Sequence, residues 1–285
     1  MKAMIVGAYG QLGRCLQAAA PAGAELVTHD LDTLDITDGN AVMAAVTAAQ
    51  PHILFNAAAY TAVDRAESEE DKALAANATA VGYLAAGARA TGARFVQVST
   101  DFVFDGISGV PYAPDAPTAP VNAYGRTKLA GEATAGSDAL IVRTAWVYAP
   151  TGGNFVRTML RLMSERPEVR VVSDQIGTPT YAPGLAAALW RLVELGATGI
   201  YHYTDSGAAS WYDFAVAIQE EALAAGLLSW AVPVIPITTA EFPTPARRPH
   251  YSVLDKQTTF VALGAPAPHW RAQLRAMIET IKTNG

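Results

Sequence analysis

The sequence predicts an α/β protein with a doubly wound parallel sheet and a smaller C-terminal lobe. Two patterns in the first half of the chain carry this prediction. Short, continuously apolar runs such as AMIVGA (3–8) are typical of strands that are buried on both faces. Longer segments with helical patterning, such as QLGRCLQAAA (11–20), separate these runs and supply the crossovers of a parallel sheet. This alternation is typical of a Rossmann-type layout.

The expected elements of the first half follow from the same two patterns. The strands share an uninterrupted apolar run, and they cover 3–8, 24–29, 52–59, 94–100 and 139–148. The helices share longer periodic segments, and they cover 11–20, 39–50, 71–92 and 122–136. Because crossovers between parallel strands are right-handed, these helices are expected to cover both faces of the sheet.

Beyond about residue 150 the alternation loosens. Two segments, 154–165 and 210–226, are expected to be helical, whereas 169–180 and 232–249 look extended, the latter being rich in proline. We therefore expect a dinucleotide-binding domain over 1–150 and a smaller substrate-binding lobe over 151–285, with elements shared across the boundary.

Composition excludes several classes of protein. The chain has 285 residues, of which 51% are hydrophobic and 16% charged, so it can bury a sizeable core. A net charge of −6 without a Lys/Arg run argues against a nucleic-acid partner. The N-terminus does not resemble a signal peptide, and no apolar run approaches a membrane span. We therefore expect a cytoplasmic protein without a membrane partner.

Other reactive side chains are expected to be structural. Cys15 is the single cysteine and lies in the first expected helix, which favours a buried thiol over a nucleophile. The five histidines are scattered without metal-ligand spacing, so no metal-binding residue is assigned. The charge run AESEEDK (66–72) is expected to be the solvated start of a helix.

Three glycines follow the first strand and open the first helix. Gly7, Gly10 and Gly13 in VGAYGQLG permit a tight turn and a close approach of backbone to a pyrophosphate. Their spacing differs from the better-known Gly-x-Gly-x-x-Gly, and the alternative is an ordinary strand-to-helix turn. The context of strand, turn and helix favours a dinucleotide site.

An acidic residue ends the second strand. Asp30 follows Gly10 at the distance expected of a carboxylate that binds an adenosine ribose. A carboxylate there repels a 2′-phosphate and favours NADH, although Asp30 is also a plausible strand cap. Asp35 and Ile36 are candidates for flanking the adenine, and Asp38 is a candidate cap of the next helix.

A tyrosine and a lysine lie four apart in YGRTK. Tyr124 and Lys128 therefore share one face of a predicted helix, where the ammonium is expected to lower the pKa of the phenol and to reach a nicotinamide ribose. Thr100 ends the preceding strand, and the carboxyl ends of parallel strands border the ligand crevice. The hydroxyls of Thr100 and Tyr124 are thus candidates for holding a ketone oxygen.

Several segments together resemble the extended short-chain dehydrogenase/reductases. More narrowly, they are similar to the dTDP-4-dehydrorhamnose reductases. Besides the glycine loop, the segments are NAAAYTAVDRAE, STDFVFDG, YGRTKLAGE, RTAWVYAPTGGNF, DQIGTPTYAPGLA, GIYHYTDSGAASWYDFA and RRPHYSVLD. The resemblance covers nearly the whole chain. It implies reduction of the C4 ketone of dTDP-4-dehydro-L-rhamnose to dTDP-L-rhamnose with NADH or NADPH.

The resemblance also implies roles for particular residues. Thr100, Tyr124 and Lys128 match the catalytic positions. Cofactor contacts fall on residues that cluster after the strands: Gly10, Gln11, Leu12, Asp30, Asp35, Ile36, Ala59, Tyr60, Thr61 and Val98. Sugar-nucleotide contacts fall on Thr100, Asp101, Tyr124 and Trp146. A diphosphate partner is one interpretation of Arg247 and Arg248, and a surface salt bridge is the other.

Two positions depart from the family pattern. Phe102 stands where the family commonly has tyrosine, so one hydrogen bond to the sugar is expected to be missing, worth about 0.5–1.5 kcal/mol. The segment PTYAPGLA lacks the acidic residue that helps some members bind a divalent ion at a dimer contact. Both a monomer and a homodimer remain open, as does a role for Mg²⁺.

Alternatives to this function stay open as well. The residue after Asp101 is not the glutamate that sugar-nucleotide dehydratases carry, which favours simple carbonyl reduction. Epimerases usually have serine in the place of Thr100, a weaker distinction. A 4-ketoreductase for another dTDP-deoxysugar and a non-catalytic, nucleotide-sensing regulatory subunit are the remaining alternatives.

Overall fold

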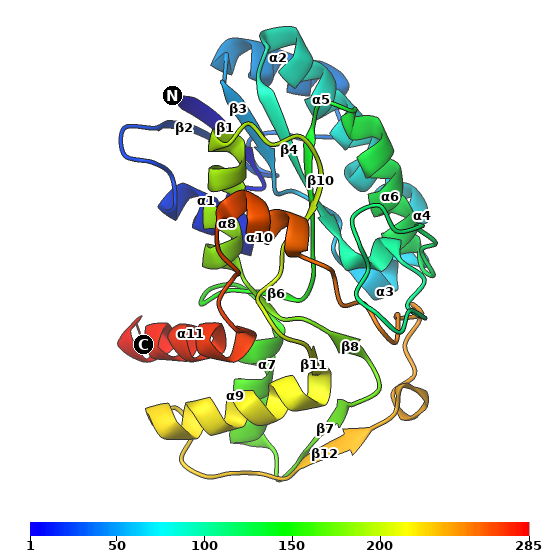
Figure 1. The fold of residues 1–285 in the computed structure, drawn as a ribbon, viewed down its shortest axis with the longest axis vertical. Helices are drawn as coiled ribbons and strands as arrows, with labels where there is room; N and C mark the ends of the chain where they lie inside the picture. Colours follow the sequence, from blue (N-terminus) through cyan, green and yellow to red (C-terminus); the bar gives the residue numbers. More distant parts are fainter. Residues whose placement is uncertain (285) are drawn as a thin grey trace.

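A six-stranded, wholly parallel sheet forms the upper part of the computed structural model, which describes residues 1–284 (Figure 1). Its strand order is β10-β5-β4-β3-β1-β2. The strands are β1 (Lys2–Val6), β2 (Glu25–His29), β3 (Ile53–Asn56), β4 (Arg94–Thr100), β5 (Leu140–Thr144) and β10 (Gly199–His202). The expected doubly wound, Rossmann-type sheet is therefore confirmed.

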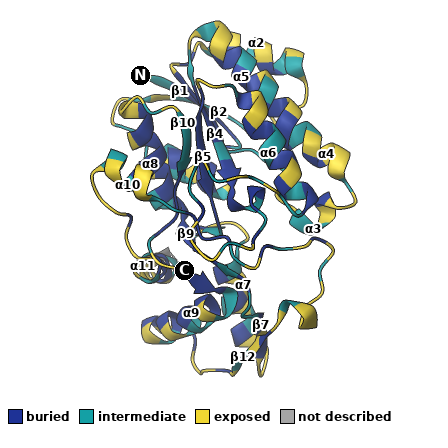
Figure 2. Ribbon diagram, turned by 45° about the vertical axis from the view of Figure 1, so that its right-hand side comes forward, coloured by how far each residue is buried: buried dark blue, intermediate teal, exposed yellow. Residues whose placement is uncertain are grey.

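Helices cover both faces of this sheet. On one face lie α1 (Gln11–Ala18) and α8 (Ala182–Glu194), which share a buried apolar cluster with the strands. The helices of the other face are α2 (Gly39–Ala49), α5 (Ala80–Thr91) and α6 (Ala123–Ala135). Figure 2 shows that the central strands and the inward sides of these helices are buried, whereas the outward sides of the helices are exposed.

Two of the expected elements are interrupted. The strand expected over 139–148 breaks into β5 and β6 (Val147–Tyr148), because Trp146 adopts a left-handed backbone with φ of 48°. The helix expected over 71–92 consists of α4 (Glu70–Leu74), a π-helical turn over Ala75–Thr79, and α5. Both irregularities lie beside the candidate site, where such features concentrate.

The last 135 or so residues contribute to two places. Strand β10 and helix α8 join the large sheet, and α10 (Gln257–Leu263) lies against them. Around a second apolar cluster pack the remaining helices, α7 (Phe155–Glu165), α9 (Trp211–Ala225) and α11 (Trp270–Asn284). The sequence patterns did not identify α8, β10, α10 or α11. The division at residue 150 stays a prediction.

Short strands and turns complete the lower part of the molecule. Strand pairs join β7 (Val169–Val172) with β12 (Val234–Ile237), β8 (Ile176–Gly177) with β11 (Ala209–Ser210), and β6 with β9 (Thr180–Tyr181). The remaining short helices are α3 (Val63–Ala66) and two 3₁₀ turns, over Asp101–Val103 and Thr239–Glu241. None of the helices described between residues 1 and 284 is both long and apolar enough to span a membrane.

Candidate active site

The glycine loop is packed too tightly for side chains. Gly7 has a φ of 74°, and a Cβ atom on it would lie 2.6 Å from the backbone nitrogen of Ala58. A Cβ atom on Gly13 would collide with the carbonyl oxygen of Gly7. Gly10 is the residue before α1, so the free backbone N–H groups of the helix start face the loop. This tight turn at a helix N-terminus suits a pyrophosphate.

Gln11 and Leu12 begin α1 and have different surroundings. The amide of Gln11 donates to the carbonyl of Gly153 at 3.2 Å and accepts from Asn154 at 2.9 Å. Leu12 is buried in the apolar cluster beneath the sheet. The glycine loop is therefore tied to the segment that precedes α7.

Asp30 is bonded to the glycine loop. Its carboxylate accepts hydrogen bonds from the backbone N–H groups of Tyr9, at 2.7 Å, and Leu31, at 2.9 Å. Arg14, which the sequence patterns did not single out, donates to the carbonyl of Tyr9 and lies 5.8 Å from the centre of its ring. A carboxylate and a guanidinium thus flank Tyr9 beside the same loop.

The residues after β2 are held by local bonds. The carboxylate of Asp35 accepts from the backbone and the hydroxyl of Thr37, which holds the pKa of Asp35 below its usual value. Ile36 is buried in the core, so its side chain packs under this segment. Asp38 caps α2 by accepting from Asn40 and Ala41, and this expectation is confirmed.

The segment Ala59–Thr61 is held by a residue that sequence reasoning missed. Asn77, in the π-helical turn, accepts from the backbone N–H of Tyr60 at 2.9 Å and donates to its carbonyl at 3.1 Å. The amide of Asn77 also donates to the hydroxyl of Thr127 on α6 at 3.1 Å. The π-helical turn therefore connects the expected cofactor segment to the helix that carries Tyr124.

The charge run over 66–72 does more than solvate a helix start, so that expectation was incomplete. Glu67 accepts from the backbone N–H of Ala123 at 2.8 Å and thereby caps α6. Glu70 forms a bidentate ion pair with Arg126, in which the shorter distance, from Nη2 of Arg126 to Oε2 of Glu70, is 2.9 Å. These pairs involve residues more than 50 positions apart, which local patterns do not reveal.

A glycine of α6, Gly125, allows Thr100 and Tyr124 to lie close together. A Cβ atom on Gly125 would collide with the carbonyl oxygen of Phe102, so only glycine lets α6 approach the turn after β4 this closely. Asn122 caps the helix by accepting from Gly125 at 2.7 Å. The Thr100 hydroxyl donates to Asp101 at 3.0 Å and accepts from the backbone of Phe102 at 3.2 Å. The ring of Phe102 meets that of Tyr124 edge-on at 5.7 Å.

The pKa of Tyr124 was expected to lie below its ordinary value, and this expectation was wrong in direction. Burial raises the pKa of Tyr124 to about 12, the charge of Asp101 adds to this, and the neighbouring Thr100 hydroxyl offsets it in part. Burial also lowers the pKa of Lys128 to about 8. The ammonium donates to the carbonyl of Val98 at 2.7 Å. The phenol is therefore protonated at neutral pH.

Asp101 is a buried carboxyl group with one free oxygen. Burial raises its pKa to about 6, and only 2% of the residue is exposed. Oδ1 accepts from Thr100, whereas Oδ2 has no hydrogen-bond partner among the described residues. A buried polar atom without a partner is unusual, and the charge of this carboxyl group acts on Tyr124.

Trp146 is fixed in its left-handed conformation by its neighbours. Its ring stacks on Trp211 with 3.5 Å between centroids and 9° between planes. A Cβ atom on Gly177 would lie 2.7 Å from the Trp146 indole, so the position must be glycine for the ring to remain there. The sequence patterns singled out neither Gly177 nor Trp211.

Two cavities share three of their lining residues. The small one, of about 80 Å³, is lined by Phe102 and Trp146 among others. The large one, of about 830 Å³, extends between α7, β7 and the segment after β12. Both are lined by Gln175, Trp211 and Arg248.

Arg248 is the charged residue at the junction of these cavities. Its guanidinium forms a two-pronged ion pair with Asp64 of α3, at 2.9 and 2.8 Å. Arg247, its neighbour, is exposed and uses its backbone carbonyl to accept from Asn122. The two arginines therefore differ, and only Arg248 lines a cavity.

The remaining candidates are the single cysteine and groups of possible metal ligands. Cys15 is half-buried in an apolar cluster, which raises the pKa of its thiol to about 11. No group of three or more His, Cys, Asp or Glu side chains with metal-binding geometry occurs within residues 1–284.

The parallel sheet, with Thr100 at the carboxyl end of β4 and with Tyr124 and Lys128 on the adjoining α6, defines a Rossmann-type protein. Within that class, the chain belongs to the family described as RmlD substrate binding domain, which matches residues 1–283. The resemblance inferred from the sequence motifs is confirmed.

Named relatives resemble nearly the whole chain. A Burkholderia thailandensis protein named dTDP-4-dehydrorhamnose reductase is 43% identical, covering 95% of this chain and 96% of its own. A solved dTDP-4-dehydrorhamnose reductase from Clostridium acetobutylicum has a TM-score of 0.93 and 40% identity over 99% of this chain and 100% of its own. The dTDP-4-dehydrorhamnose reductase from Bacillus anthracis, solved in complex with NADP, has a TM-score of 0.92 and 37% identity over 98% of this chain and 99% of its own.

Proposed function

We propose that this chain is an NAD(P)H-dependent oxidoreductase that reduces the C4 ketone of dTDP-4-dehydro-L-rhamnose to dTDP-L-rhamnose. The observation that carries the proposal is the arrangement of Thr100 at the end of β4 and of Tyr124 and Lys128 on α6, next to Phe102, which lines the small cavity. The relatives in this family, which bear the name of that activity, support it.

The glycine loop would hold the cofactor. Side chains are excluded at Gly7 and Gly13, which leaves backbone N–H groups to meet a pyrophosphate. Asp30 would bind the adenosine ribose, and Lys128 would reach the nicotinamide ribose. Whether NADH or NADPH is preferred depends on the balance between Asp30 and Arg14, which flank Tyr9. When bound, the reduced nicotinamide supplies the hydride to C4 of the sugar.

The protein's own side chains would handle the proton. Because its pKa is about 12, the Tyr124 phenol carries a proton at neutral pH and can give it to the carbonyl oxygen as that oxygen becomes an alkoxide. Thr100 would turn its hydroxyl from Asp101 to the same oxygen and orient the ketone. The ammonium of Lys128 would stabilise the phenolate that remains.

The two cavities suit the two ends of a nucleotide sugar. The small cavity borders Phe102 and Trp146 and would take the deoxysugar, with Trp146 as an apolar wall. The large cavity would take the thymidine end. The diphosphate joins these ends, so it would lie at the shared boundary, where Arg248 offers a guanidinium.

One experiment tests the reaction directly. Purified protein is mixed with NADH or NADPH and the enzymatically prepared keto-sugar, and the absorbance at 340 nm is followed. We expect oxidation of the coenzyme and dTDP-L-rhamnose as the product by NMR. Unchanged absorbance under conditions where a known reductase turns over would refute the proposal.

The same experiment distinguishes a related activity. Phe102 supplies no hydroxyl to the small cavity, which favours a different hold on the sugar. If another dTDP-4-keto-deoxysugar is reduced faster than the rhamnose precursor, the chain is a 4-ketoreductase of different specificity. Stable association with a partner enzyme and no turnover of any keto-sugar would instead indicate a regulatory subunit.

Location and assembly complete the proposal. We expect a cytoplasmic enzyme that works as a monomer or a homodimer, without nucleic acid, and light scattering of the purified chain decides between the two assemblies. Turnover that survives exhaustive chelation would exclude a requirement for Mg²⁺.

A further inference from the structure

A buried ion pair lies beneath the catalytic candidates, and the proposed reaction does not use it. Arg143 on β5 donates to Glu132 on α6 from Nε at 2.9 Å and from Nη2 at 2.7 Å. The two side chains are only 3% and 6% exposed. Ser99 completes the group by donating its hydroxyl to Glu132 at 2.5 Å.

Stability alone does not explain this pair. Removing two charges from water costs free energy that their attraction does not reliably recover, so apolar residues of similar size often serve a core equally well. The ion pair is also specified in detail, since Arg143 donates to the carbonyl of Pro114 at 3.0 Å and its guanidinium lies 5.1 Å from the Phe104 ring centre.

The geometry connects all three catalytic candidates. Glu132 lies one turn after Lys128 on α6, and Ser99 immediately precedes Thr100 on β4. Ser99 and Arg143 are paired residues on neighbouring strands. Glu132 therefore fastens the helix of Tyr124 and Lys128 to the ends of β4 and β5, and a shift of α6 along the sheet would break its three hydrogen bonds.

The charges around Lys128 are few. Glu132 on its own helix acts on Lys128, whereas Asp101 in the turn after β4 acts on the neighbouring Tyr124. From β5 comes Arg143, already engaged by Glu132.

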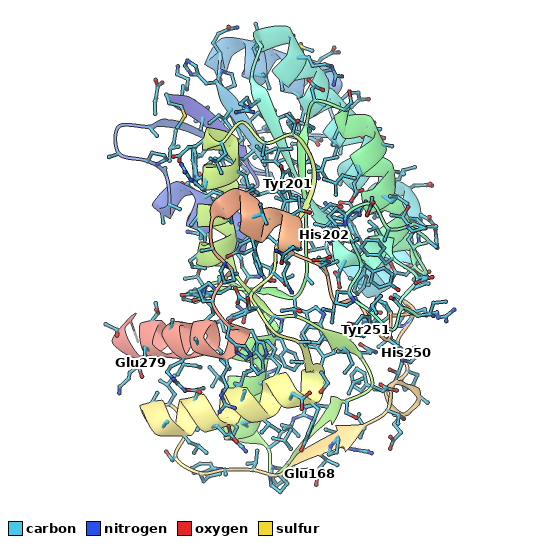
Figure 3. The ribbon with its side chains drawn as sticks, viewed as in Figure 1. Glu168, Tyr201, His202, His250, Tyr251 and Glu279 are labelled. Atoms are coloured by element: carbon cyan, nitrogen blue, oxygen red, sulfur yellow. The ribbon has the colours of Figure 1, made fainter. Side chains whose placement is uncertain are left out.

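The other groups near this pair are uncharged. His202, at the end of β10 (Figure 3), lies 3.4 Å from Arg143, and burial keeps its imidazole neutral by lowering its pKa to about 3. The π-helical turn contributes the neutral amide of Asn77. Burial lowers the pKa of Lys128, and the charge of Glu132 acts against that effect.

We propose that Glu132 is a positioning residue: held by Ser99 and Arg143, it fixes α6 against β4 and keeps Lys128 in its ammonium form at neutral pH. The consequence of this positioning for turnover rests on the proposed function. The protonation state of Lys128 is a property of the folded chain, so it can be measured whether or not the proposed reaction occurs.

The direct test is an NMR titration of Lys128 in protein labelled with ¹³C at the lysine side chains, assigned with Lys128→Arg. We expect the ammonium form to predominate at pH 7 in the unaltered protein. Glu132→Gln should lower the pKa of Lys128 by about one unit, since an opposite charge nearby shifts a pKa by 1–3 units. Arg143→Gln should raise it, because Glu132 is then no longer neutralised.

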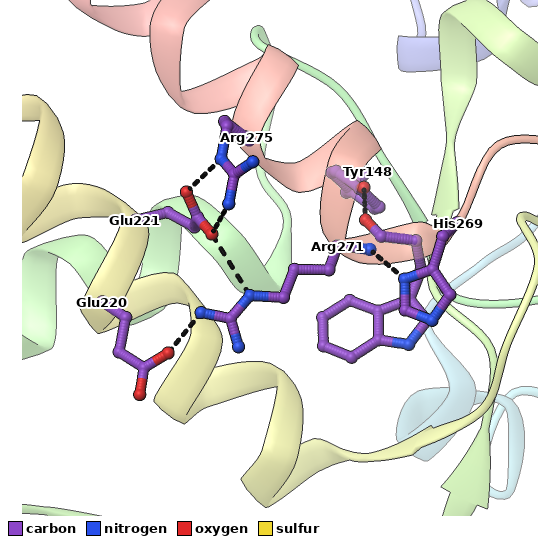
Figure 4. Close-up of polar contacts among 7 residues, drawn as sticks. Tyr148, Glu220, Glu221, His269, Arg271 and Arg275 are labelled. Atoms are coloured by element: carbon purple, nitrogen blue, oxygen red, sulfur yellow. Dashed lines mark hydrogen bonds and ion pairs between the residues drawn. The ribbon is translucent and has the colours of Figure 1, made fainter.

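The opposite directions separate this proposal from a purely structural role, in which neither variant would shift the pKa. Glu221→Gln is the matched control. Glu221 is buried and paired with Arg275 at 2.8 Å and Arg271 at 3.2 Å, in the other part of the molecule (Figure 4). The control should lose stability and leave the titration of Lys128 unchanged.

Activity gives a second readout. If the proposed reaction is confirmed, the fall of kcat/KM at high pH should begin about one unit lower in Glu132→Gln than in the unaltered protein. Three results would overturn the proposal. Lys128 could already be neutral at pH 7 in the unaltered protein, its pKa could be the same in both variants as in that protein, or its pKa could shift in the same direction in both variants. If neither variant folds, a neutral Lys128 at pH 7 in the unaltered protein would still overturn the proposal. An inactive protein with the expected titration would refute the reaction alone.

Discussion

The candidate site has two walls that are built in different ways. The catalytic wall consists of β4, the turn after it and α6, and its polar groups bond to one another over short stretches of chain. The recognition wall consists of Trp146, Gln175, Trp211 and Arg248, and each comes from a different segment.

The difference suggests a division of tasks. In the proposed reaction, the groups that would move a proton lie on a strand and a helix, where small displacements are costly. The groups that would select the substrate lie on segments whose mutual placement the whole fold decides. Substitutions in one wall at a time test this division, and the largest effect is expected at Tyr124.

Tyr124→Phe breaks the catalytic wall at its proton donor. We expect kcat to fall about 10²–10⁴-fold, because the phenol is the group placed to protonate the alkoxide. Affinity for the nucleotide sugar, measured by calorimetry, should stay within a few-fold. A variant that keeps more than a tenth of the kcat would assign the proton to another group.

Asp101→Asn tests the same wall through the pH dependence of folding stability. The folded-state pKa of Asp101 is raised from 3.8 to about 6, so the folded protein holds this proton more tightly than the unfolded chain. Its contribution is therefore full below pH 4 and is lost as pH rises through 6, by an amount of about 3 kcal/mol.

The measurement is urea unfolding of both proteins from pH 4 to pH 8. The stability of the unaltered protein relative to Asp101→Asn should fall across this range and level off above pH 7. A difference that stays constant with pH would mean that Asp101 is ionised with an ordinary pKa.

Arg248→Met breaks the recognition wall, with Arg247→Met as its control. Hydrogen bonds to a charged group contribute about 1.5–3 kcal/mol, so the Kd for the nucleotide sugar should rise about 10- to 100-fold. The effect on kcat at saturation should be smaller. Equal effects of the two substitutions would remove Arg248 from the diphosphate site.

Gly177→Ala disturbs the recognition wall without removing a functional group. The added methyl would displace the Trp146 ring, and overpacking of this kind costs about 1–3 kcal/mol. We expect KM to rise several-fold while kcat changes less, together with altered tryptophan fluorescence. Gly109→Ala, where an added Cβ atom meets nothing within 4 Å, should change neither quantity.

The sequence predicted the two walls unequally. Gly7, Gly13, Thr100, Tyr124 and Lys128 stand in short motifs, and their strands and helices are local structures that periodicity reveals. Even there, the direction of the Tyr124 pKa shift was wrong, because the spacing of Tyr124 and Lys128 contains no information about burial.

The sequence predicted little of the recognition wall. Arg248 pairs with Asp64 across 184 positions of the chain, and no local pattern records such a contact. The strand break at Trp146 follows from the stack with Trp211 and the space that Gly177 leaves, although LIVRTAWVY reads as one strand.

By itself, the sequence determined the parallel sheet, the glycine loop and the family, since apolar periodicity and short motifs act over a few residues. Only the tertiary structure decided which groups are buried together. Burial shifts the pKa values of Tyr124, Asp101 and Lys128, and it depends on packing between α6, β4 and β5. The small cavity next to Phe102 exists because segments far apart in the chain fold against one another.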